Sequence, residues 1–191
     1  MPDPFKAMLE SRPEWSDWYQ VRPLPGFTPE VGKLVDMLAY ARLMTVEAVR
    51  GLSVEELDSV PPGFSNSIGM LLAHIAATDR IYQYLSFEGV DPIQDDVSEY
   101  RPFVGAMTFG AQGERVQSRS LEELLSQLAE VRAVTLAELA RRDDAWLAST
   151  TPNAHMNQHW AWFHVMEDEV SHRGQMRVLR KALKTQLGAV E

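Results

Sequence analysis

The residues best suited to chemistry are a carboxylate and an imidazole near the C-terminus, Asp168 and His172. Residues 164–175 contain no proline and a single glycine, so this segment can form a helix. Residues four apart lie one above the other on a helix, which brings the two side chains together. Apolar residues continue the same stripe at Val165, Met176, Leu179 and Leu183. This face should therefore point inward, where a charge is costly unless it is paired or bound to a metal.

A third polar side chain, His74, lies inside another predicted helix and shares its side with apolar residues. Bundles bring side chains of facing helices together, and their interiors often hold metal sites. Two imidazoles and one carboxylate leave open positions on an ion, which is typical of a catalytic centre. A second interpretation fits the same residues. In it His74 is hydrogen-bonded to Asp168 within the core, His172 is half-exposed, and no metal is bound.

Two neighbours on the same predicted helix could assist this set. His164, two turns before His172, could contact a substrate or cofactor or support a ligand, although a core or rim position also suits it. Gln175, one turn after His172, could orient a ligand or bond to the next helix. The aromatic residues that begin this segment are expected to pack rather than to bind: Trp160, Trp162 and Phe163.

Glu169 completes a Glu-x-x-His pattern with His172, as found in di-iron bundles. The equivalent position before His74 is Leu71, so a second such motif is missing there. We therefore expect Glu169 to face outward and to pair with Arg173, four residues later.

The composition narrows the possible functions. A chain of 191 residues can bury one core, and a net charge of −9 without a basic stripe argues against nucleic-acid binding. The absence of cysteine excludes disulfides, thiolate metal sites and thiol nucleophiles, and it fits a cytoplasmic protein. No signal peptide is evident, and no apolar stretch approaches the roughly 20 residues of a membrane span, so we expect no membrane partner.

Helical periodicity and start signals predict four long helices, at about residues 28–51, 65–88, 120–142 and 157–187. Thr28 precedes a proline and is the expected N-cap of the first helix. The second helix can be capped by the serine and asparagine cluster at 65–67, and Ser120 opens a capping box for the third. No segment alternates like a strand. The expected fold is an all-α four-helix bundle.

The remaining segments should connect and cover the bundle. Residues 1–27 are rich in proline and aromatics and are expected to form an N-terminal arm that packs on a single bundle domain, 28–191. Residues 89–119 lack a sustained period and should form a long connection, with room for a short helix, over one end of the fold. Long connections of this kind are often functional. Residues 143–156 are expected to form a loop.

Two motifs resemble the DinB/YfiT-like superfamily. The stretch Ser67-Ile68-Gly69-Met70-Leu71-Leu72-Ala73-His74-Ile75-Ala76 is similar to its second-helix motif, and His172-Arg173-Gly174-Gln175-Met176 resembles its fourth-helix signature. Residues 51–57 also resemble a subfamily related to mycothiol-dependent enzymes such as maleylpyruvate isomerase. The resemblance covers roughly residues 30–185. It implies an up-down-down-up bundle, often a homodimer, with a divalent metal held by three side chains, by position His74, Asp168 and His172.

The resemblance leads to two hypotheses of different classes. The first is a divalent-metal-dependent enzyme, with Zn²⁺ or Ni²⁺, acting on a small molecule as a transferase or isomerase. Any low-molecular-weight thiol would come from outside, because the chain has no cysteine. Hydrolysis by metal-activated water fits the same residues, and no residue is assigned as nucleophile or general base. The second is a stress-related binding or scaffold protein without catalysis. Family members usually carry His or Glu where this chain has Asp168, and the shorter side chain could alter metal choice.

Overall fold

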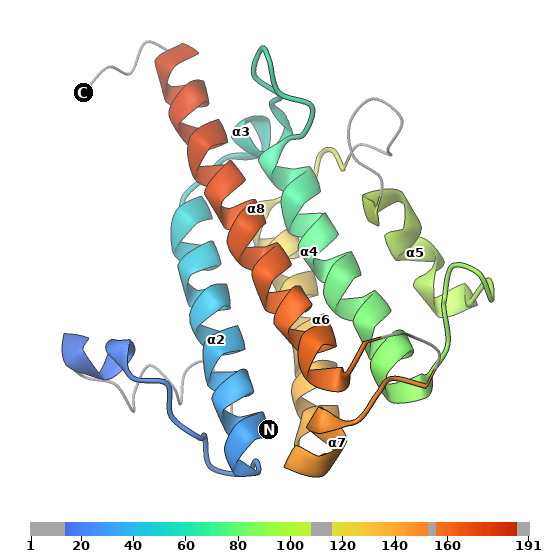
Figure 1. Ribbon diagram of the computed structural model, residues 1–191. Helices are drawn as coiled ribbons and strands as arrows, with labels where there is room; N and C mark the ends of the chain where they lie inside the picture. The colour runs from blue at the N-terminus through green and yellow to red at the C-terminus, as the bar shows by residue number, and fades with distance from the viewer. Residues whose placement is uncertain (1–13, 108–115, 153–155, 187–191) are drawn as a thin grey trace.

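The protein is an all-α bundle of four long helices, as the sequence predicts. The computed structural model describes residues 14–107, 116–152 and 156–186. The long helices are α2 (Pro29–Val49), α4 (Ile68–Gln83), α6 (Leu121–Leu139) and α8 (Gln158–Gln186). They run up, down, down and up, and α8 packs between α2 and α4 (Figure 1). No strand is present among these residues.

The helix starts follow the predicted capping chemistry, with one difference. The Ser67 hydroxyl accepts a hydrogen bond from the Met70 N–H, and Ser120 forms the predicted capping box of α6. At α2 the Thr28 side chain does not cap the helix, because its hydroxyl donates to Asp144. The Asp144 carboxylate accepts instead from the backbone N–H groups of residues 30 and 31. Asp144 begins α7 (Asp144–Ala148), a short helix where the sequence predicts a loop.

The connection between α4 and α6 runs back along α4, whereas the sequence predicts a cover over one end of the bundle (Figure 1). After α4 the chain makes a π-helical turn, Tyr84–Glu88, which ends at Gly89 with a φ of +71°. The chain then forms short helices at Ser98–Tyr100, Arg101–Val104 (α5) and Gly105–Met107. Tyr100 anchors them, since its buried hydroxyl donates to the Ala77 carbonyl of α4. Residues 108–115 of the predicted connection lie outside the described part.

The described part of the N-terminal segment lies against α2. A 3₁₀ turn spans Trp15–Tyr19, and the Trp18 ring centroid is 6.3 Å from that of Tyr40 on α2. Gly32 permits a close backbone approach, because a Cβ atom there would lie 2.7 Å from the Leu24 nitrogen. These contacts agree with an arm that packs on the bundle. The division into an arm (1–27) and one bundle domain (28–191) stays a prediction, and residues 1–13 lie outside the described part.

The core consists mainly of two apolar clusters, and α8 contributes residues to both. One lies near the start of α4 and includes Leu57, Ile68, Leu71, Leu72, Ile75, Leu124, Leu128, Met176 and Leu179. The other lies near the start of α2 and includes Val31, Leu34, Val35, Leu38, Leu139, Leu147, Trp162 and Val165. No helix in the described ranges is both long and apolar enough to cross a bilayer.

Between these clusters lies a layer of four buried charges, one from each long helix. The residues are Arg42 (α2), Asp79 (α4), Arg132 (α6) and Glu169 (α8), and none exceeds 7% exposure. Arg42 Nε donates to Glu169 at 2.7 Å, Arg132 Nε donates to Asp79 at 2.6 Å, and Arg132 Nη2 reaches Glu169 at 3.1 Å. The expectation that Glu169 faces outward is therefore wrong. Glu169 is fully buried, and its partners are the two core arginines rather than Arg173.

The charge layer positions α8 against the other three helices. Its two guanidinium groups and two carboxylates balance, and the Thr135 hydroxyl donates to the remaining oxygen of Asp79. A buried charge that loses its partner is strongly destabilising, so the favoured register of the helices is the one in which every ion pair of the layer is formed. Asp168 directly precedes Glu169 on α8, so this register also determines the position of Asp168.

Candidate metal centre

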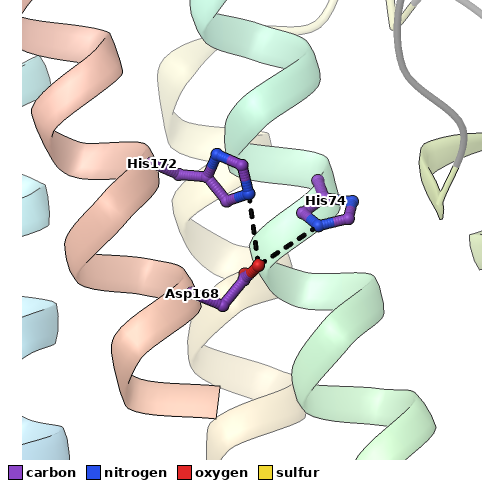
Figure 2. Close-up of side chains that lie close together, drawn as sticks. All are labelled: His74, Asp168 and His172. Atoms are coloured by element: carbon purple, nitrogen blue, oxygen red, sulfur yellow. Dashed lines mark ion pairs between the residues drawn. The ribbon is translucent and has the colours of Figure 1, made fainter. Parts of the chain in front are cut away.

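The three predicted ligands come together between α4 and α8. His74 lies on α4, and Asp168 and His172 lie one turn apart on α8 (Figure 2). His74 Nε2 is 3.4 Å and His172 Nε2 is 3.2 Å from the same Asp168 oxygen, Oδ1. One ligand atom from each residue lies within 4.8 Å of the others. The side chains are 8%, 10% and 14% exposed for His74, His172 and Asp168. The site is thus nearly buried.

The tautomer of His74 follows from its surroundings. His74 Nδ1 lies 2.8 Å from the Ala106 carbonyl oxygen, which can only accept a hydrogen bond. Nδ1 must therefore carry a proton, and in the neutral ring the lone pair is left on Nε2, the atom that faces Asp168. The Thr78 hydroxyl is 3.2 Å from this Nε2 and lies one turn along α4. Ala106 belongs to the short helix Gly105–Met107 after α5, and its carbonyl holds the His74 ring at the nitrogen that faces away from Asp168.

His172 is oriented in the same way by a different group. Its Nδ1 lies 3.1 Å from Oε1 of Gln175, so Nδ1 donates to the amide and Nε2 faces Asp168. Gln175, proposed from the sequence as a cofactor contact or orienting residue, therefore lies against a candidate ligand. Burial alone would lower the pKa of His172, but the hydrogen bond and the charge of Asp168 outweigh burial and raise it.

Asp168 is the centre of the set. Burial favours its neutral form, but the hydrogen bonds and charges that His172 and His74 supply when Nε2 also carries a proton outweigh burial, and the pKa of this carboxyl falls well below its usual range. Asp168 therefore stays ionised at neutral pH. Its second oxygen, Oδ2, is buried and has no hydrogen-bond partner within the described residues. A buried carboxylate oxygen without a partner is unusual in a folded protein.

These groups fit a divalent cation. With both Nδ1 atoms donating, two neutral rings direct lone pairs at a carboxylate, so three electron-rich groups face one another. The repulsion between these groups is relieved either by extra protons, which make the rings cationic, or by a metal ion that accepts a lone pair from each of the three groups. Imidazole nitrogen with carboxylate oxygen suits Zn²⁺ and Ni²⁺, and outer hydrogen bonds to Nδ1 are usual for metal-bound histidine. Metal binding at this site stays a proposal.

His164 lies outside the three-residue group. Its Nδ1 is 3.1 Å from the carboxylate of Glu167, and its ring stacks on Trp160 with 5.1 Å between centroids and an angle of 3°. The three aromatic residues expected to pack rather than to bind differ in their burial. Trp162 is fully buried, whereas Trp160 and Phe163 are 47% and 45% exposed.

The sequence interpretation missed two groups beside the site. One is the Ala106 carbonyl, for which no side-chain pattern could give a signal. The other is Tyr82 on α4, whose ring centroid lies 5.5 Å from that of His164. A signal for Tyr82 existed, because residues 74, 78 and 82 follow one another at four-residue spacing on one face of α4.

Comparison with known proteins agrees with this fold and adds a family. A conserved protein from Enterococcus faecalis has a similar structure, with a TM-score of 0.59 and 18% sequence identity, covering 78% of this chain and 94% of that one. At this identity the likeness concerns the fold alone. None of the curated proteins compared with the chain matches it significantly. The sequence profile of a family described as mycothiol-S-transferase matches residues 33–185. The chain therefore belongs to the mycothiol-S-transferase family, in agreement with the DinB/YfiT-like motifs at His74 and His172.

Proposed function

We propose that the protein is a divalent-metal-dependent S-transferase that joins mycothiol, or a similar low-molecular-weight thiol, to a small-molecule acceptor. Membership of the mycothiol-S-transferase family supports the reaction class. The observation that carries the metal is the convergence of His74 Nε2 and His172 Nε2 on one buried oxygen of Asp168. The family favours transfer over the isomerisation and hydrolysis that the sequence motifs also allow.

His74, Asp168 and His172 would hold Zn²⁺ or Ni²⁺. Two neutral imidazoles and one carboxylate would leave a net charge of +1 on a site with a divalent ion, and this charge favours an anionic sulfur. A bound divalent ion would supply Lewis acidity, which lowers the pKa of a thiol so that it ionises near neutral pH. The thiol has to come from outside because the chain contains no cysteine.

The protein's own groups prepare this site in three ways. The Ala106 carbonyl and the Gln175 amide hold the two histidines with Nε2 toward Asp168. The charge layer at Glu169 fixes the height of α8 and therefore of Asp168. Burial of the set limits water, which strengthens each electrostatic interaction.

We also propose a homodimer, which the resemblance implies and light scattering would test, and His164 as a residue near the small-molecule partner.

The first experiment is metal content by mass spectrometry on untagged protein, comparing wild type, His172→Ala and His164→Ala. We expect about one equivalent of metal in the wild type and in His164→Ala, and loss of metal in His172→Ala. The reason is that His172 belongs to the three-residue set and His164 does not. Calorimetric titration with mycothiol should then show binding that depends on the metal. Absence of metal in all three proteins after incubation with zinc or nickel would refute the proposal and favour a metal-free hydrogen-bonded cluster in a scaffold protein.

A further inference from the structure

An aromatic wall lies along α8 and α4 beside the candidate metal centre. We define it as Trp160, His164 and Tyr82. The Trp160 and His164 rings are parallel, with 5.1 Å between centroids, and the His164 and Tyr82 centroids are 5.5 Å apart. Trp160 is 47% exposed, and a tryptophan ring that is already stacked on one face and open to solvent is a ready platform for another flat ring.

The wall leads to the candidate metal centre along both helices. On α8, residues 160, 164, 168 and 172 follow at four-residue spacing, so Trp160 and His164 continue the line of Asp168 and His172. On α4, Tyr82 lies two turns from His74 on the same side. Burial, and after it the charges of Asp168 and Glu167, raise the pKa of the Tyr82 phenol. The phenol therefore keeps its proton at neutral pH and is a hydrogen-bond donor beside the site.

The Tyr82 hydroxyl differs from those of two other tyrosines on the same side of the molecule. Tyr84 accepts a hydrogen bond from Arg80, and Tyr100 donates to the Ala77 carbonyl. The Tyr82 hydroxyl makes no side-chain hydrogen bond with another residue of the described part. A half-buried donor without a protein partner can bind a ligand acceptor with no loss of an existing bond.

We propose that the aromatic wall binds the acceptor substrate of the thiol transfer, and that this acceptor is a flat, uncharged aromatic electrophile that carries a leaving group such as chloride. In the transfer the thiol loses its proton to solvent, its sulfur forms a C–S bond to the ring carbon, and the carbon–chlorine bond breaks to release chloride. The acceptor ring would stack on the exposed Trp160 ring, which His164 supports by its own stacking, and an electron-withdrawing oxygen on the acceptor, such as a nitro or carbonyl oxygen, would accept a hydrogen bond from Tyr82. The carboxylates of Glu167 and Asp168 next to the wall disfavour an anionic acceptor. This inference rests on the proposed function, because it assigns the second substrate of that reaction.

The test uses binding of 1,3-dinitrobenzene, which is flat and uncharged but lacks a leaving group, measured by calorimetry on the full-length protein. The proteins compared are wild type, Trp160→Leu, Tyr82→Phe and the matched control Phe163→Leu. Phe163 is an equally exposed aromatic residue of α8 outside the wall. We expect the dissociation constant to rise about three- to tenfold in Trp160→Leu and in Tyr82→Phe, from loss of stacking and of one hydrogen bond, and to stay unchanged in Phe163→Leu.

A kinetic measurement separates binding at the wall from a general structural effect. With mycothiol and 1-chloro-2,4-dinitrobenzene, Trp160→Leu should raise KM for the nitroarene and leave KM for the thiol unchanged. Equal affinities for dinitrobenzene in all four proteins, an equal loss in Phe163→Leu, or no binding by the wild type would overturn the inference. Metal content is measured in the same samples. Wall-dependent binding by a protein that holds no metal would contradict the proposed function and leave the wall as a ligand site.

Discussion

Removing the charge of Glu169 should destabilise the whole bundle. Glu169 is fully buried and accepts three hydrogen bonds, two from Arg42 and one from Arg132. In Glu169→Gln the two guanidinium groups (+2) face only Asp79 (−1), which leaves one uncompensated positive charge in the core. Breaking a buried pair in this way costs about 3–5 kcal/mol. For a chain of this size the loss corresponds to a fall in Tm of roughly 6–20 °C.

The assay is urea and thermal unfolding followed by circular dichroism, with Glu167→Gln as the control. Glu167 lies two residues earlier on α8, and its side chain is 49% exposed. We expect Glu167→Gln to change the free energy of unfolding by less than about 0.5 kcal/mol. Metal content should also fall in Glu169→Gln, because the register of α8 places Asp168. If the two variants unfold within about 2 °C of each other, the buried charges do not hold α8 in register.

Three further outcomes test the site and the helices. Gln175→Leu removes the acceptor of His172 Nδ1 and should weaken metal affinity about 10- to 100-fold, whereas an unchanged affinity would show that the amide does not orient the ring. Protons compete with the metal for His172, whose pKa is raised, so metal affinity should fall up to about tenfold for each unit of pH below that pKa. Asp168 stays ionised over this range and adds no pH dependence of its own. Calorimetric titrations from pH 5 to 8 measure this, and a flat profile would contradict it. Ser120→Ala should lower the free energy of unfolding by about 1 kcal/mol through loss of the α6 capping box. An unchanged free energy of unfolding in urea would show that the Ser120 side chain does not stabilise the start of α6.

Local sequence determines much of the helical framework and one half of the site. Apolar residues at helical spacing and the serines before α4 and α6 place the long helices, because both signals act within a few residues of the chain. Asp168 and His172 could be paired from sequence for the same reason, since a helix brings residues four apart together whatever surrounds it. His74 could be named as a third candidate from its place on the apolar side of another predicted helix, and the family motif supported it, but neither signal is a local contact with Asp168.

Only the tertiary structure decides which polar residues face inward and what completes the site. Glu169 looks like a surface residue beside Arg173, and its burial is favourable only because Arg42 and Arg132 reach it from helices 127 and 37 positions away. The Ala106 carbonyl acts on His74 from 32 positions away, and a backbone atom leaves no trace in the residue type. Burial of a charge or the orientation of an imidazole depends on partners brought in by folding, so no local pattern can determine either.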